Sequence, residues 1–275
     1  MTRAAISAGG SALCRLRARG ALLSAFLLLG PGLLQYRYIP GSVTRYRVEQ
    51  TVRTTLEPKG GEARLVAEQA STIIARRQVV RSIGGKATVE ETPVEGQVRT
   101  RTSGGAIEHV VDPVTRIFTY ARDGRCLGVA RRAPQGVKDP GPQFLDGLSF
   151  PLPLKPTVRG MQWKATLTAR GARNDRITIR FTGRYLGEAR RGDHPCAHLA
   201  FTFKAAFRTG HEKAGSAPAG TIDGTITQYF ARDIGQDAEV TGTLRRTVPA
   251  TATAREGATS VRSVTTIRVR QALLP

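Results

Sequence analysis

Apolar and polar side chains alternate along most of the chain, most clearly between residues 176 and 244. Ile177, Ile179 and Phe181 fall on every second position, with threonine and arginine between them. Because successive side chains of a strand point to opposite faces, this spacing gives one apolar face and one polar face. The alternation restarts at residues 197–207, 222–230 and 240–244, which predicts four neighbouring strands of an antiparallel meander.

The first half of the chain shows the same two-residue period. Residues 44–56 alternate without interruption, and turn sequences at residues 57–61, 84–85 and 104–105 separate the stretches that follow. A last strand is predicted at residues 261–271, and no segment keeps a helical spacing for a comparable length. The sequence therefore predicts an all-β fold of curved antiparallel meanders that form a half-barrel, an open barrel or a sandwich.

A proline-rich stretch divides the two meanders. Six prolines fall within residues 131–156, and because proline cannot donate a ladder hydrogen bond, no regular central strand is expected there. Gly160 and Trp163 open the second half much as Gly41 and Tyr46 open the first. The predicted organisation is a signal peptide or anchor at residues 1–35, a first meander half at 36–132, a connection at 133–158 and a second meander half at 159–275.

The beginning of the chain has the layout of a secretory signal. Arginines without any acidic residue precede an apolar run at residues 21–29, and Gly30-Pro31-Gly32 ends that run. The run predicts a signal helix and export to the periplasm, the cell envelope or the exterior. It is shorter than the roughly 20 residues that span a bilayer, but an uncleaved signal would tether the protein to a membrane. An organelle transit peptide is the other alternative.

The charge of the chain is strongly positive and mostly due to arginine, with a net value of +21. The arginines are spread along the polar faces of the predicted strands, as at Arg45, Arg47 and Arg53. One interpretation is a solvated face, and the other is docking on an anionic membrane or envelope polymer. Nucleic acid is not favoured, because its binding proteins usually concentrate charge in one patch with stacking aromatic residues.

Three cysteines are present, and Cys14 lies in the predicted signal. Cys126 and Cys196 remain, an even pair in a chain that is predicted to be exported. They are candidates for a disulfide, and the alternative is two separate thiols, because sequence spacing cannot bring two Cα atoms within reach.

Three short patches resemble a known group of proteins. They are residues 150–153 with 160–163, residues 192–199, and residues 224–230 with Gly235. In these patches the chain resembles exported bacterial β domains that are related in shape to the lipoprotein-carrier half-barrels. The resemblance covers mainly the second half and implies a curved sheet around a hydrophobic cavity that holds a lipid-like ligand. It assigns no functional residue.

Metal chemistry has one candidate cluster. His194, Cys196 and His198 fall on every second residue of a predicted strand, so they would share a face, and imidazole and thiolate are ligands for zinc or copper. A metal site usually takes ligands from a second element, and the sequence offers no second cluster. No cofactor is predicted.

Catalytic motifs are not found in the sequence. It contains neither a G-x-S-x-G elbow nor a phosphate-binding loop. The carboxylate pairs Glu90–Glu91 and Asp233–Asp237 are interpreted as solvated surface in turns or on polar faces.

The sequence therefore predicts a non-enzymatic, exported cell-envelope protein that binds an apolar ligand in a curved sheet. An arginine-rich module that docks on an anionic surface is the alternative, and a metal-dependent hydrolase is the least favoured. The oligomeric state is left open. The candidate cavity residues, which serve equally well as core, are Tyr46, Val48, Phe181, Tyr185, Phe201, Phe203, Ile226 and Phe230.

Overall fold

A computed structural model of the chain describes residues 32–137, 149–170, 176–207, 220–250 and 261–275. This part of the chain consists of strands and connections, with no helix long and apolar enough to cross a membrane. The predicted signal helix lies outside the described residues. The strands are β1 (Val43–Pro58), β2 (Arg64–Ile83), β3 (Lys86–Thr102), β4 (Gly105–Val110), β5 (Thr115–Ala121), β6 (Cys126–Arg132), β7 (Gln162–Arg170), β8 (Arg176–Arg191), β9 (His194–Phe207), β10 (Gly220–Ala231), β11 (Gln236–Ala250) and β12 (Val261–Leu273).

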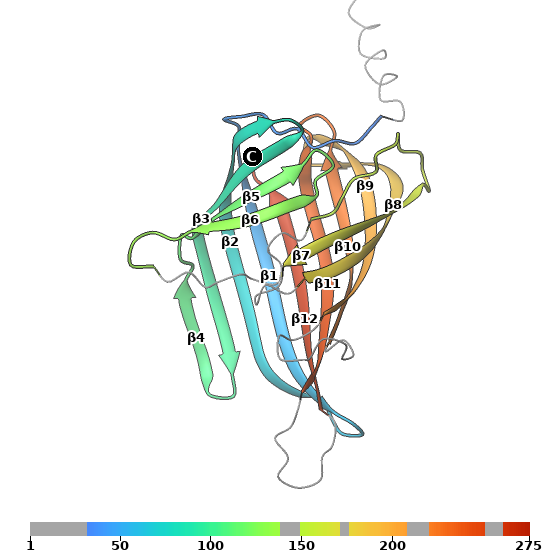
Figure 1. The fold of residues 1–275 in the computed structure, drawn as a ribbon. Helices are drawn as coiled ribbons and strands as arrows, with labels where there is room; N and C mark the ends of the chain where they lie inside the picture. Colours follow the sequence, from blue (N-terminus) through green and yellow to red (C-terminus); the bar gives the residue numbers. More distant parts are fainter. Residues whose placement is uncertain (1–31, 138–148, 171–175, 208–219, 251–260) are drawn as a thin grey trace, which may run out of the picture.

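All of these strands belong to one antiparallel sheet. Their order is β6-β5-β3-β2-β1-β12-β11-β10-β9-β8-β7, and β4 pairs with the lower part of β3. The end strands β6 and β7 are not paired with each other, so the sheet is open. Figure 1 shows the sheet curving until β5–β6 and β7–β8 lie in front of its centre. The all-β prediction is confirmed, and the open barrel, not the sandwich, is the form observed.

The two meander halves share this sheet because β1 pairs with β12. Val52 lies opposite Ile267, and the same register runs from Tyr46–Leu273 to Pro58–Val261. Strands from the two ends of the described chain therefore meet at the centre of the sheet. The predicted proline-rich connection lies between β6 and β7, and its described residues form no strand.

The alternation of the sequence sets the two faces of the sheet. On β1, Tyr46 and Val52 point to the concave side, whereas Arg45 and Arg53 are exposed on the convex side. The main core follows the concave side of β7 to β12, where buried apolar residues pack together. These are Leu34, Leu152, Leu167, Ile177, Ile179, Phe181, Tyr185, Ala197, Leu199, Phe201, Phe203, Ala205, Phe207, Ile222, Ile226, Phe230, Val240, Leu244 and Ile267.

Glycines opposite aromatic residues allow large rings to lie against the concave face. Trp163 pairs with Gly183, Phe203 pairs with Gly224, and Phe207 pairs with Gly220. A Cβ atom at Gly224 would lie 2.6 Å from Cζ of Phe203 and 2.6 Å from the carbonyl oxygen of Thr243. Glycine therefore leaves the space that each ring fills, an arrangement that stabilises strand glycines and permits strong curvature.

Replacing Gly224 by alanine is expected to destabilise the protein by about 1–3 kcal/mol, because overpacking displaces the neighbouring side chain and backbone. Urea unfolding followed by the fluorescence of Trp163 measures the change. Gly128→Ala on β6 is the matched control, since its Cβ would meet nothing within 4 Å, and a change of about 0.5 kcal/mol or less is expected there. Equal effects at the two sites would contradict the role assigned to the ring of Phe203.

Candidate functional site

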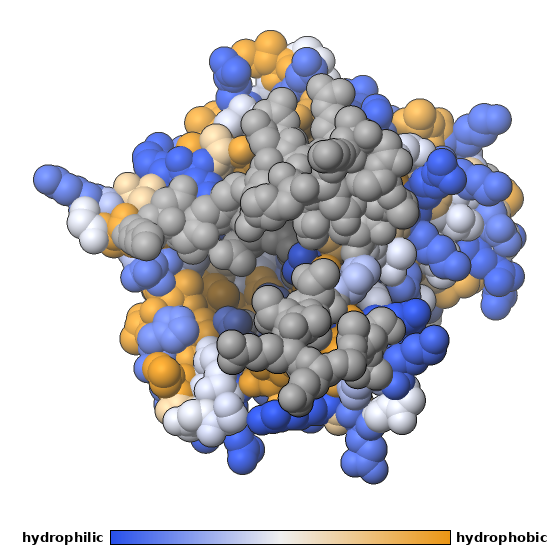
Figure 2. Space-filling model, turned by 60° about the horizontal axis from the view of Figure 1, so that its bottom comes forward, coloured by the Kyte–Doolittle hydropathy of each residue, from blue (hydrophilic) through white to orange (hydrophobic). Residues whose placement is uncertain are grey.

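The concave side of β7 to β12 presents a continuous apolar surface, here called the apolar face. Its centre is fully buried by neighbouring side chains, and its margin is partly exposed at Val52, Val248 and Val269. Figure 2 views the molecule from its lower end, with mostly hydrophilic residues projecting from the outside, some hydrophobic residues among them, and hydrophobic residues in the part of the hollow left uncovered. On β7 to β12 the curved sheet thus has a largely apolar concave side.

The eight candidate cavity residues all point to the concave side, but they do not have the same surroundings. Phe181, Phe201, Phe203, Tyr185, Ile226 and Phe230 belong to the main core and are at most 4% exposed. Tyr46 is 1% exposed and lies in a polar network, whereas Val48 is half-buried. Six of the eight are therefore buried core residues of the apolar face and have little exposed surface of their own.

Two segments outside the strands close one end of the hollow. Residues 33–39, here called the strap, cross the upper end of the sheet in Figure 1. The amide of Tyr36 donates to the carbonyl of Arg122 at 3.3 Å, and the amide of Arg37 donates to the carbonyl of Gly235 at 2.9 Å. The open sheet has two halves, here called its wings, namely β1 to β6 and β7 to β12. Because these carbonyls lie in the β5–β6 and β10–β11 turns, the strap connects the two wings.

The second closing segment is residues 149–153, which lie between β6 and β7. The amide of Leu152 donates to the carbonyl of Asp123, and Nε1 of Trp163 donates to the carbonyl of Pro151 at 2.9 Å. The ring of Phe150 packs against Phe181 and Phe201. Of the described residues outside the strands, only four belong to the main core or pack against it, namely Leu34, Tyr36, Phe150 and Leu152.

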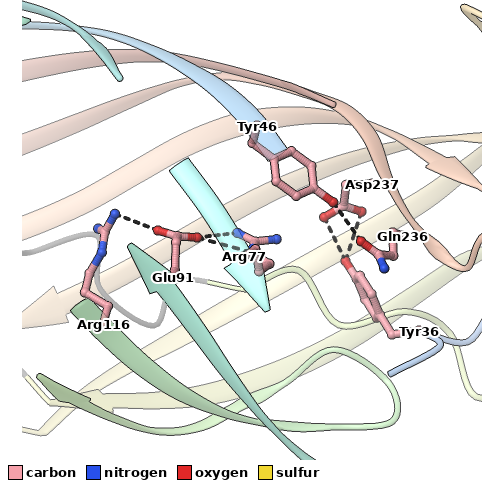
Figure 3. A network of polar contacts seen from close by, with 7 residues as sticks. All are labelled: Tyr36, Tyr46, Arg77, Glu91, Arg116, Gln236 and Asp237. Atoms are coloured by element: carbon pink, nitrogen blue, oxygen red, sulfur yellow. Dashed lines mark hydrogen bonds and ion pairs between the residues drawn. The ribbon is translucent and has the colours of Figure 1, made fainter. Parts of the chain in front are cut away.

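A buried ion-pair network occupies the concave side of β2, β3 and β5 (Figure 3). Nη2 of Arg77 lies 2.6 Å from Oε2 of Glu91, and Nη2 of Arg116 lies 2.6 Å from Oε1 of the same carboxylate. Burial alone raises the pKa of Glu91, but attraction to Arg77 and Arg116 outweighs burial and holds this pKa below its usual value. The glutamate is therefore charged, and it fixes two arginines on the interior side of the sheet.

A second cluster of polar side chains joins the strap to the sheet. The hydroxyl of Tyr36 donates to Asp237, with distances of 3.1 and 3.2 Å to its two oxygens, and Nε2 of Gln228 donates to the Tyr36 oxygen at 2.8 Å. Burial raises the pKa of Asp237, and the hydrogen bonds from Gln228 and Tyr36 partly oppose that rise. Nearby, the hydroxyl of Tyr46 donates to Oε1 of Gln236 at 3.0 Å.

These polar groups border a small cavity at the closed end, with a volume of about 110 Å³. Arg77 and Asp237 are the charged residues in its lining, and Phe150 and Val240 connect it to the apolar face. Tyr38 and Tyr120 also line it, with their rings stacked 5.9 Å apart. The structure therefore places a small pocket, in which polar groups stand among apolar ones, at the end of an apolar surface.

Sequence interpretation missed the charged members of this site. Glu91 and Asp237 were expected to be solvated, but Glu91 is only 7% exposed and Asp237 is hydrogen-bonded in the interior. The position of Glu91 along its strand could have indicated that it is buried, because Glu91 lies on the same concave face as Ala87 and Val89. Arg77 likewise stands between the concave residues Ala75 and Val79.

The two cysteines are separate thiols, so the disulfide prediction is corrected. Cys126 begins the end strand β6, whereas Cys196 lies on β9 in the other wing. The thiol of Cys126 donates to the carbonyl of Gly128, and Cys196 is buried beside Ala231 and Ala238. The strand order puts the two cysteines in different wings, a separation that the sequence alone does not show.

The candidate metal ligands have other contacts. Nδ1 of His194 lies 2.8 Å from Asp233, and the ring of His198 stacks on Tyr229 at 4.5 Å. The thiol of Cys196 donates to the carbonyl of His194. Within the described ranges, no group of three or more His, Cys, Asp and Glu side chains could hold a metal ion.

Several arginines of the convex face are paired with carboxylates. Nε of Arg53 lies 3.0 Å from Glu68, and Nε of Arg270 lies 3.0 Å from Glu239. Cross-strand pairs of this kind stabilise a sheet by at most about 1 kcal/mol each. Docking on an anionic surface stays a prediction.

Comparison with known proteins identifies no family. No family model matches the chain, and no curated protein matches it either. Among solved structures, lipovitellin matches with a TM-score of 0.45 and 12% identity over 87% of this chain, which spans only 26% of the lipovitellin chain. A candidate lipoprotein of Parabacteroides distasonis matches with a TM-score of 0.31 and 8% identity over 88% of this chain and 98% of its own.

A third solved structure is DynF, from the dynemicin biosynthesis pathway of Micromonospora chersina. It matches with a TM-score of 0.24 and 11% identity over 89% of this chain and 86% of its own. These TM-scores lie below 0.5, so the likenesses assign no function. The open curved sheet agrees with the shape implied by the lipoprotein-carrier resemblance, while membership of that family stays a prediction.

Proposed function

We propose that the protein is a non-enzymatic, exported envelope protein that holds an apolar, lipid-like ligand against the apolar face. The observation that supports this role is the concave apolar surface of β7 to β12, onto which described residues outside the strands pack only at the closed end. Its partly exposed margin at Val52, Val248 and Val269 is where a ligand would make contact. Export itself is a prediction from residues 1–32.

The size of the hydrophobic effect makes such binding feasible. Burying about 300 Å² of hydrocarbon at about 25 cal/mol per Å² contributes about 7–8 kcal/mol, from which the loss of translational freedom must be subtracted. After a loss of at least about 4 kcal/mol, burial of this area leaves about 3–4 kcal/mol or less, which corresponds to millimolar affinity at best, so a larger buried area or polar contacts must add to it. Residues 33–39 and 149–153 restrict one end of the hollow, so a chain would extend toward the other end.

Native mass spectrometry of the purified protein and titration with the neutral fluorescent probe N-phenyl-1-naphthylamine test this proposal. The expected result is saturable probe binding that long-chain lipids displace. Replacing Val52 by glutamine puts an amide at the margin of the apolar face, and a loss of about fivefold or more in probe affinity is expected from the lost apolar contact.

Thr51→Gln is the matched control. Thr51 is the neighbouring residue of the same strand and points to the convex side, so its replacement is expected to leave probe affinity unchanged. No saturable binding, or equal effects of the Val52 and Thr51 substitutions, would exclude a ligand on the apolar face.

A further inference from the structure

The small cavity at the closed end is lined by polar groups that keep hydrogen-bond donors beyond those used within the fold. Nε and Nη2 of Arg77 are bound to Glu91, whereas Nη1 has no hydrogen-bond partner among the described residues. The hydroxyls of Tyr38 and Tyr120 are likewise without a hydrogen-bond partner in the described part of the chain. These three donors belong to residues that line one cavity, so a ligand or ordered water in the cavity could accept from them.

The protonation of the two phenols makes them hydrogen-bond donors. Burial raises the pKa of Tyr38 and of Tyr120 above the usual value, so both stay protonated. Together with Nη1 of Arg77, they offer three donors to an oxygen atom. Asp237 in the same lining is an acceptor, and its two oxygens already receive hydrogen bonds from Tyr36 and Gln228.

The cavity has room for a small polar head group. A cavity needs about 10–15 Å³ to hold one water molecule, so a cavity of about 110 Å³ accommodates a carboxyl group. Phe150 and Val240 lead from the cavity to the main core, so a hydrocarbon chain attached to the group would reach the apolar face.

We propose that the cavity bordered by Arg77, Tyr38 and Tyr120 holds the carboxyl group of a long-chain acid whose hydrocarbon chain lies on the apolar face. This assignment rests on the function proposed above and specifies its ligand class. The carbonyl oxygen of the acid accepts from Arg77 and the two phenols. The acid proton lies toward Asp237, since two neighbouring carboxyl groups bind a proton more readily than one.

The test compares three ligands of one chain length, namely palmitic acid, hexadecanol and methyl palmitate, by displacement of N-phenyl-1-naphthylamine from the purified protein. The acid is expected to bind at least tenfold more tightly than the ester, which cannot donate a hydrogen bond, with the alcohol in between. In the double variant Tyr38→Phe, Tyr120→Phe, affinity for the acid is expected to fall by about thirtyfold, which corresponds to about 1 kcal/mol for each of the two lost hydrogen bonds. The ester carbonyl accepts from the same two phenols, so affinity for the ester is expected to fall as well, while the advantage of the acid over the ester, which comes from the proton shared with Asp237, is expected to remain.

Tyr229→Phe is the matched control, because Tyr229 lies beside His198 and Arg191 away from the cavity, and no change is expected. Each single Tyr→Phe variant is measured as well, and thermal unfolding verifies that all variants are folded. Equal affinity for acid and ester, tighter binding of the alcohol, or an unchanged acid affinity in the double variant would overturn the carboxyl assignment and leave the apolar site standing. Failure of all three ligands to bind would overturn both proposals.

Discussion

Replacing Glu91 by glutamine is expected to destabilise the protein by about 3–4 kcal/mol, because removing one member of a buried ion-pair network leaves the other charges uncompensated. The carboxylate lies 2.6 Å from both Arg77 and Arg116, and its side chain is 9% exposed. A neutral amide keeps the shape and loses the charge. Chemical unfolding at pH 7, followed by circular dichroism, measures the effect.

Glu90→Gln is the control for this change, since Glu90 is the adjacent residue and pairs with Arg132 in a more exposed position. Exposed pairs of this kind contribute at most about 1 kcal/mol. A similar loss of stability in both variants would show that general charge balance, and not the buried network, is responsible.

The same network makes the stability of the folded protein depend on pH in the acidic range. Because folding lowers the pKa of Glu91, its contribution is complete above the unfolded value near 4.5 and disappears as the pH falls toward the lowered folded value. The free-energy difference between wild type and Glu91→Gln should therefore shrink as the pH decreases below about 4.5. A difference that stays constant down to the lowest pH at which both are folded would contradict this assignment.

Replacing Tyr36 by alanine is expected to cost about 3–5 kcal/mol, the range for removal of a large packed aromatic side chain. The ring packs on Phe230 with centroids 5.1 Å apart, and its hydroxyl connects Gln228 with Asp237. The variant loses this packing and leaves two interior polar groups with one partner fewer. Urea unfolding and the exchange rates of amides in the β5–β6 and β10–β11 turns report the change.

Ile39→Ala is the matched control in the strap, because Ile39 is 63% exposed. A change within about 0.5 kcal/mol is expected for such a surface position. If amide exchange in the two turns were as slow in Tyr36→Ala as in the wild type, the strap would not connect the wings in the way described.

Local patterning predicted the strands well but could not predict their arrangement. The alternation of Ile177, Ile179 and Phe181 follows from strand geometry, which is a property of neighbouring residues. The pairing of β1 with β12 joins residues such as Thr54 and Thr265, which are 211 positions apart. No local signal specifies such a partner, so an open sheet and a sandwich could not be distinguished.

The polar part of the site was missed because residue type was given more weight than register. Carboxylates are usually exposed, and that expectation was applied to Glu91 although its neighbours on the same face are Ala87 and Val89. Arg77 occupies an equivalent position on β2. An acid and a base that interrupt the apolar faces of two adjacent strands are a recognisable sign of an interior ion pair, provided the strands are known to be adjacent.

The central pairing of β1 with β12 also has a consequence for how the sheet assembles. Until β12 is available, β1 and β11 both have a free hydrogen-bonding edge in the middle of the future sheet, where aggregation begins most readily. A fold dominated by such distant pairings forms slowly. During that delay the exposed edges of incomplete molecules can pair with one another, so aggregation during refolding is expected to rise with protein concentration.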